Sequence, residues 1–126
     1  MKIFVYGTLK TDGILHRYME GSEFVKNKKL EGYVLYLSKD ETYPLIYFTG
    51  KEKDIVRGEI WKINKTIKKR LDKYEEGYFL KKLLNVPIQV YYPTFNVKKI
   101  CKKIPRNKEG EYEFNVEPEF YKGFYG

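Results

Sequence analysis

The chain begins with Met1-Lys2-Ile3-Phe4-Val5-Tyr6-Gly7-Thr8-Leu9-Lys10. Residues 3–6 are apolar and rich in β-branched and aromatic side chains, and so short a run predicts a buried strand rather than a helix. Gly7 ends the predicted strand, because glycine allows a sharp turn and the close approach of another molecule. The backbone amides of residues 8–10 then follow one another directly, and successive N–H groups of this kind can form a concavity that binds an anion. The alternative is an edge strand followed by an ordinary turn.

A second informative stretch, residues 64–77, predicts one short helix. Asn64 is a suitable N-cap, and Gly77 is a suitable residue to end the helix. Three apolar residues recur at helical spacing and form the inward-facing stripe: Ile67, Leu71 and Tyr74.

Two adjacent carboxylates follow this stripe. At roughly 100° per residue, Glu75 lies about 70° from the centre of the stripe and Glu76 about 170° from it. We therefore expect Glu75 at the edge of the core and Glu76 in water. Alternatively, Glu75 is a half-exposed acid paired with one of the many lysines, which is the commoner fate of such a residue.

Three short blocks stand in order along the chain: Tyr6-Gly7-Thr8-Leu9, then Val56-Arg57-Gly58-Glu59-Ile60-Trp61, then Leu71-Asp72-x-x-Glu75 followed by Tyr78. Their order and spacing resemble the gamma-glutamylcyclotransferase-like family, of the gamma-glutamylamine cyclotransferase type, over roughly residues 2–92. The chain departs from the family's pattern at Glu76, which stands where the family usually has glycine directly after the glutamate. This departure leaves open whether Glu75 or Glu76 enters the pocket.

The resemblance implies an α+β fold, a small mixed β-barrel with one or two short helices. It also implies an enzyme that cyclises a gamma-glutamyl group to 5-oxoproline and releases the attached amine or amino acid. The glutamate of the Leu-Asp-x-x-Glu block, here Glu75, is the implied general acid/base. We expect the partner, a small gamma-glutamyl substrate, to contact the first loop and one tyrosine after the helix: Tyr6, Gly7, Thr8, Leu9 and Tyr78.

A gamma-glutamyl compound carries its own nucleophile, the free α-amino group, so the reaction needs no serine or cysteine nucleophile. Holding the conformer that closes the five-membered ring supplies several kcal/mol of the barrier. A carboxylate must take a proton from the amine and return it to the leaving nitrogen. We expect burial and the helix C-terminus to raise the pKa of Glu75, with nearby lysines opposing both effects. The amides after Gly7 would hold the substrate α-carboxylate, and the hydroxyl of Tyr6 or Tyr78 would stabilise the oxyanion.

The composition favours one folded domain, residues 1–126, because 42% of the residues are apolar and 17% are aromatic. The net charge of +8 is spread along the chain, which favours a solvated surface over a nucleic-acid site. Cys101 is the only cysteine, which fits a cytoplasmic protein, and His16 is the only histidine, so we expect no metal and no cofactor. No run is long and apolar enough for a membrane span, and the N-terminus lacks the apolar region of a signal peptide.

Further strands are predicted between the two informative stretches, the first two paired with each other: residues 22–28, 30–38, 43–48 and 55–63. Gly58 predicts a bend or a close backbone approach within the last of them. Glu59 shares a face with Trp61, so we expect its carboxylate to be partly buried and hydrogen-bonded. Residues 93–126 lie outside the resemblance, and we expect this basic and aromatic tail to pack on the barrel.

Two alternatives to the enzyme stay open. The same barrel can serve as a non-catalytic small-molecule-binding protein, because a fold does not guarantee an activity. A basic nucleic-acid-binding barrel is the less favoured alternative, and steep salt dependence of binding to DNA or RNA would identify it. Release of 5-oxoproline separates the enzyme from both. The sequence does not specify the oligomeric state.

Overall fold

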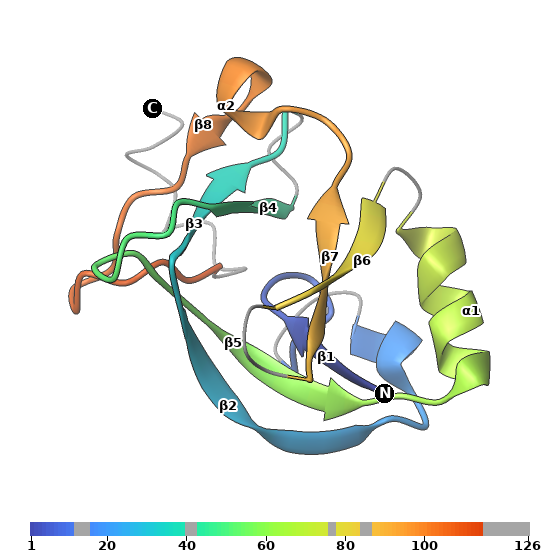
Figure 1. Cartoon of the computed structure of the whole chain (residues 1–126). Coiled ribbons are helices and arrows are strands. Elements are labelled where there is room, and N and C mark those ends of the chain that lie inside the picture. The colour runs from blue at the N-terminus through green and yellow to red at the C-terminus, as the bar shows by residue number, and fades with distance from the viewer. Residues whose placement is uncertain (12–15, 40–42, 76–77, 84–86, 115–126) are drawn as a thin grey trace.

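The computed structural model describes residues 1–11, 16–39, 43–75, 78–83 and 87–114. This part of the chain is a mixed α+β structure, in which α1 lies beside the strands (Figure 1). The strands are β1 (Lys2–Val5), β2 (Glu23–Glu31), β3 (Tyr33–Leu37), β4 (Pro44–Phe48), β5 (Ile55–Lys62), β6 (Tyr78–Lys82), β7 (Gln89–Pro93) and β8 (Lys102–Lys103). The helices are the 3₁₀ turn η1 (His16–Met19), α1 (Lys65–Tyr74) and the short α2 (Val97–Ile100).

β1 is the central strand of a five-stranded sheet with the order β2-β5-β1-β7-β6. It pairs antiparallel with β5, where Ile3 lies opposite Trp61, and parallel with β7, where Phe4 lies opposite Val90. Successive side chains of a strand point to opposite faces. Ile3 and Val5 accordingly join one buried cluster with α1, and Phe4 joins the other with β3 and β4. The predicted buried strand is confirmed, and the edge-strand alternative is wrong.

The chain passes from this sheet to a second one at Gly32, where φ is +89°. β2 ends directly before this glycine and β3 begins directly after it. Only glycine adopts such a conformation without strain, so one residue divides a continuous strand pattern into strands of two sheets. The predicted pairing of these two segments with each other is therefore wrong. β2 pairs with β5, whereas β3 pairs with β4 and β8 in a sheet of order β4-β3-β8.

The described strands form two open sheets, not the closed β-barrel that the resemblance implies. β2 and β6 are the edges of the first sheet, and β4 and β8 are the edges of the second. The sheets pack on each other through β3 against β5 and β4 against β7. The α+β class with short helices is confirmed, whereas closure fails within the described residues because the bend at Gly32 separates the strands into two hydrogen-bonded sets.

α1 begins as predicted. The side chain of its N-cap, Asn64, accepts a hydrogen bond of 2.9 Å from the amide of Ile67, and both Ile67 and Leu71 are buried. The prediction that Tyr74 completes the buried stripe of α1 is wrong, because Tyr74 is 38% exposed. The helix ends at Tyr74, and the predicted terminator Gly77 lies outside the described residues.

The first part of the predicted tail packs on the sheets. Ile104, Tyr112 and Phe114 are buried, and Tyr112 forms a parallel bridge with Val56 of β5. Residues 115–126 lie outside the described part of the chain, so the rest of the expected tail packing stays a prediction.

Candidate active site

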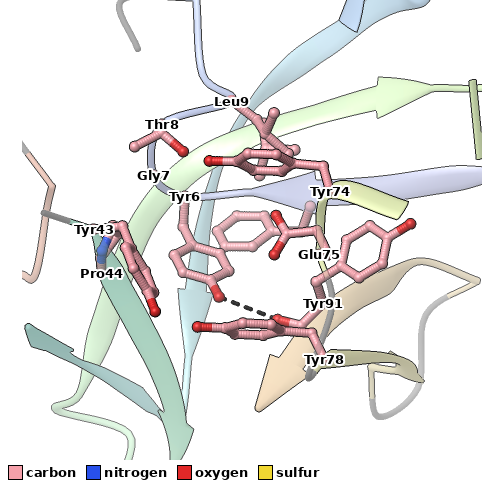
Figure 2. A pocket seen from close by; sticks show the side chains of 12 residues that line it. Tyr6, Gly7, Thr8, Leu9, Tyr43, Pro44, Tyr74, Glu75, Tyr78 and Tyr91 are labelled. Carbon is pink, nitrogen blue, oxygen red and sulfur yellow. Dashed lines mark hydrogen bonds between the residues drawn. The ribbon is translucent and has the colours of Figure 1, made fainter. Parts of the chain in front are cut away.

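A cavity of about 190 Å³ opens where β1 ends. Its walls come from segments far apart in sequence: the loop after β1, the start of β4, the end of α1, β6 and β7 (Figure 2). The lining residues are Phe4, Val5, Tyr6, Gly7, Thr8, Leu9, Tyr43, Pro44, Tyr74, Glu75, Tyr78 and Tyr91. All the residues that the sequence predicted for the site therefore meet in one cavity, and their roles stay predictions.

The Glu75 carboxylate points into the middle of this cavity (Figure 2). Glu75 is the C-cap of α1: its amide still bonds to the Leu71 carbonyl at 2.7 Å, but its φ of −88° and ψ of 41° are no longer helical. No hydrogen bond or ion pair joins its carboxylate to another described residue. Burial alone raises the pKa of Glu75 to about 7. The neighbouring Glu76 lies outside the described residues, so the choice between the two carboxylates stays a prediction.

Five tyrosines line the cavity around this carboxylate. Two of them, Tyr6 and Tyr78, differ in the hydrogen bonds that their hydroxyls make. The Tyr6 hydroxyl donates to the Tyr91 carbonyl at 3.1 Å and accepts from the Ile46 amide. Because its one proton is already committed, Tyr6 fits the role of a wall better than that of the predicted oxyanion donor. Burial raises the pKa of Tyr6 above its usual range, so the hydroxyl stays protonated.

The Tyr78 hydroxyl is buried and makes no well-formed hydrogen bond within the described residues, although the Tyr43 hydroxyl is close enough to interact with it. Burial and then the nearby Tyr6 raise the pKa of Tyr78 above its usual range. Tyr78 is therefore a protonated donor inside the cavity, and only the weak contact with the Tyr43 hydroxyl competes for its proton. A buried donor without a partner is costly, and a bound carbonyl oxygen would satisfy it.

The loop after β1 forms a tight turn in which the Lys10 amide donates to the Gly7 carbonyl at 3.1 Å. The predicted row of three anion-binding amides is therefore reduced to those of Thr8 and Leu9, which donate to no other described residue. The Thr8 hydroxyl faces the Tyr74 hydroxyl across the cavity rim (Figure 2). Two neighbouring amides can still hold a carboxylate, and such binding by this loop stays a prediction.

Side chains outside the cavity hold this loop in place. The Glu59 Oε1 atom accepts hydrogen bonds from the Thr11 amide at 2.8 Å, the Thr11 hydroxyl at 3.1 Å and the Trp61 indole at 3.1 Å. The His16 Nδ1 atom donates to the Leu9 carbonyl at 2.8 Å, and its ring packs on Trp61. The expectation of a partly buried, hydrogen-bonded Glu59 is confirmed. Neither Glu59 nor His16 lines the cavity.

Gly7 has a structural role that the sequence did not predict. Its φ is not positive, and a Cβ at this position would lie 2.6 Å from Cγ of Pro44. The missing side chain thus leaves room for the Pro44 ring at the start of β4, and the close approach of a ligand to Gly7 stays a prediction. The close backbone approach predicted at Gly58 is confirmed, because a Cβ there would collide with the Phe4 ring and the β1 backbone.

Sequence reasoning missed three tyrosines of the cavity, namely Tyr43, Tyr74 and Tyr91. Tyr74 was assigned to the core by helical spacing, and the other two lie in strand regions whose place beside Glu75 depends on long-range pairing. For Tyr43, a local signal was its position at the start of the predicted strand 43–48.

Within the described ranges, no group of three or more His, Cys, Asp or Glu side chains is placed to hold a metal ion. In the same part of the chain, no helix has the length and apolar character needed to cross a membrane.

The sequence model of the family described as "Gamma-glutamyl cyclotransferase, AIG2-like" matches residues 3–114. The curated protein PH0828 of Pyrococcus horikoshii is 30% identical over 77 residues, which span 61% of this chain and 61% of that relative. The crystal structure of PH0828 superposes with a TM-score of 0.66 at 24% identity, over 89% of both chains. An AIG2-like protein from Mus musculus gives a TM-score of 0.66 at 22% identity, over 93% of this chain and 96% of that one. A solved gamma-glutamyl cyclotransferase gives 0.60 at 19% identity, over 83% and 70%. These structures share the fold.

Proposed function

The chain belongs to the AIG2-like gamma-glutamyl cyclotransferase family, and from this membership we propose that it cyclises a gamma-glutamyl group to 5-oxoproline and releases an amine or amino acid. Glu75 is the proposed general acid/base. The observation that carries the proposal is a largely buried carboxylate, with its pKa raised to about 7, directed into a cavity beside the loop of Tyr6 to Leu9. A group with a pKa near the working pH can both accept and return a proton.

The proposed reaction needs one proton carrier and no external nucleophile. Ionised Glu75 takes a proton from the substrate α-ammonium group, and the free amine attacks the γ-carbonyl carbon to close the five-membered ring. Glu75 returns this proton to the leaving nitrogen as the C–N bond breaks. The ring nitrogen gives up its second proton as it becomes the lactam N–H, and the released amine carries that proton away in its ammonium form, so the enzyme ends in its starting state. Confinement in a small cavity favours this step, because ring closure requires a folded conformer of the substrate.

The surrounding groups support one orientation of the substrate. The amides of Thr8 and Leu9 would receive the α-carboxylate, and the Tyr78 hydroxyl would donate to the γ-carbonyl oxygen as it gains negative charge. The described lining residues include no lysine or arginine, so both stabilising contacts depend on neutral donors. Such donors act strongly in a cavity from which water is largely excluded.

The test is 5-oxoproline release from a panel of gamma-glutamyl amines, amino acids and peptides. Glu75→Gln keeps the size of the side chain but cannot carry the proton, so turnover should fall by roughly 100-fold or more with KM largely kept. Glu76→Gln is the matched control and should change turnover little. Circular dichroism checks that both variants fold.

Two results would contradict the proposal in different ways. Full activity in Glu75→Gln beside an inactive Glu76→Gln would move the role to the adjacent carboxylate and keep the mechanism. A wild-type protein that is inert on the whole panel but binds gamma-glutamyl compounds would instead identify a non-catalytic small-molecule-binding protein.

A further inference from the structure

Asp72 lies on α1, three residues before Glu75, and does not line the cavity. Its Oδ1 atom accepts a hydrogen bond of 2.6 Å from the Tyr91 hydroxyl, and its Oδ2 atom lies 2.6 Å from Nζ of Lys68. Burial would raise the pKa of Asp72, but the hydrogen bonds from Lys68 and Tyr91 outweigh it and lower the pKa. Asp72 is therefore a charged acceptor for Tyr91 at neutral pH.

Tyr91 connects this carboxylate to the other side of the cavity. It belongs to β7, its ring lines the cavity beside Glu75, and its hydroxyl points away from the cavity (Figure 2). Its carbonyl accepts the hydroxyl of Tyr6 at 3.1 Å. Hydrogen bonds thus run from α1 through Tyr91 to Tyr6, which is the first residue of the proposed substrate loop.

This connection matters because α1 ends at Tyr74, so no further helical turn fixes Glu75. We propose that Asp72 is a positioning residue: by holding the Tyr91 hydroxyl, it fixes the Glu75 carboxylate relative to the loop of Tyr6 to Leu9 and keeps the Tyr91 ring as the cavity wall beside it. The kinetic part of this inference rests on the proposed function, and the placement of Glu75 does not.

Glu75 is sensitive to the position of that wall because no opposite charge among the described residues compensates it. The groups that face it from the packed elements are tyrosines: Tyr6 after β1, Tyr43 before β4, Tyr74 of α1, Tyr78 of β6 and Tyr91 of β7. Its protonation is therefore governed by how completely water is excluded. A wall that moves by about 1 Å would also disturb the alignment of the reacting atoms, which can cost about 100-fold in rate.

The kinetic experiment measures three variants: Asp72→Ala, Tyr91→Phe and the double variant that combines these two changes. Lys68→Ala is the control. Asp72→Ala and Tyr91→Phe should each lower kcat by about 10-fold to 100-fold with KM changed much less. The double variant should be no worse than the poorer single variant, because all three lack the same hydrogen bond. Lys68→Ala removes the other partner of Asp72 and should behave as wild type.

The second measurement does not depend on turnover. ¹³C NMR of the glutamate side-chain carboxyl groups, assigned with Glu75→Gln, follows the ionisation of Glu75 from pH 4 to 9. In Asp72→Ala its pKa should fall from about 7 toward the ordinary 4.5 as water enters. Asp72→Asn keeps an acceptor for Tyr91 without the charge, so it should recover most of the loss in both kcat and pKa.

Three results would overturn the inference. Additive losses in the double variant would show that the two residues act separately. An equal fall of the Glu75 pKa in Asp72→Asn and Asp72→Ala would show that the charge acts rather than the hydrogen bond. An unchanged Glu75 titration in Asp72→Ala would show that Asp72 does not position it, even if the wild-type protein releases no 5-oxoproline and the proposed function fails.

Discussion

Replacing Glu75 by glutamine should stabilise the protein while sharply lowering the proposed activity, and the gain in stability should grow with pH. A rise in the pKa of Glu75 from 4.5 to about 7 corresponds to about 3 kcal/mol between its protonated and ionised forms in the fold. Because the folded state holds the proton more tightly than the unfolded chain, wild-type stability falls as pH rises from about 4.5 through about 7. Glutamine carries no charge at any pH and escapes this loss.

The expected difference in free energy of unfolding is therefore small near pH 4 and about 2–3 kcal/mol in favour of Glu75→Gln at pH 8. With a typical urea dependence of about 1–3 kcal/mol/M, the unfolding midpoint of the variant should lie about 1–2 M higher at pH 8. Urea titrations monitored by circular dichroism at pH 4, 5, 6, 7 and 8 measure this curve. The exposed Glu109 offers a matched control, because Glu109→Gln should change stability by less than about 0.5 kcal/mol at every pH.

A constant difference between wild type and Glu75→Gln from pH 4 to pH 8 would refute the reasoning, since it would mean that Glu75 titrates normally. A variant that is less stable than wild type at pH 8 would refute it more strongly, because it would require a stabilising partner for the ionised carboxylate. Neither result depends on the identity of the substrate.

Three further predictions follow from individual contacts. Gly7→Val should cost about 1–3 kcal/mol in urea unfolding and also raise the substrate KM, because the new side chain must displace Pro44; unchanged stability and KM would contradict the collision. Asp54→Asn should destabilise the protein more at pH 7 than at pH 3, because hydrogen bonds from Thr49 and Arg106 outweigh burial and hold the pKa of Asp54 below its usual range, and this stabilisation shrinks as pH falls below the unfolded pKa; equal losses at both pH values would exclude this pairing. Titration with acetate should shift the amide NMR signals of residues 8–9 before those of other loops, and no shift there would remove the proposed carboxylate site.

Local sequence signals predicted the elements that carry the site. The apolar run before Gly7 predicts β1, and Asn64 marks the start of α1, because strand length and capping are properties of neighbouring residues. The bend at Gly32 was not predicted, because a positive φ cannot be distinguished from an ordinary strand glycine by spacing. The predicted sheet partners of β2 and β3 were wrong, because pairing between strands far apart in the sequence depends on the whole fold.

The cavity residues also divide into those that local sequence predicted and those that long-range pairing brings into place. Tyr6 to Leu9 and Glu75 belong to blocks that can be recognised one at a time, whereas the Tyr91 ring reaches Glu75 only because β7 pairs with β1. Burial raises the pKa of Glu75, and no described lysine contributes to the shift, so the expected opposition from nearby lysines does not decide its value. Burial is a sum over all surrounding segments, and a sequence pattern does not give that sum.

The position of Glu75 also shows why a correct prediction can rest on incomplete geometry. Helical spacing placed Glu75 at the edge of the core, but the same spacing placed Tyr74 inside, and Tyr74 is exposed. The difference arises because α1 ends at Tyr74 and Glu75 adopts a non-helical φ and ψ. Within the block Leu71-Asp72-x-x-Glu75, the buried Leu71 anchors the last turn and Asp72 holds Tyr91, while the end of the helix frees Glu75 to turn into the cavity. A longer helix would keep Glu75 in a fixed phase against the core, so the place where α1 ends is as necessary to the proposed acid/base as the carboxylate itself.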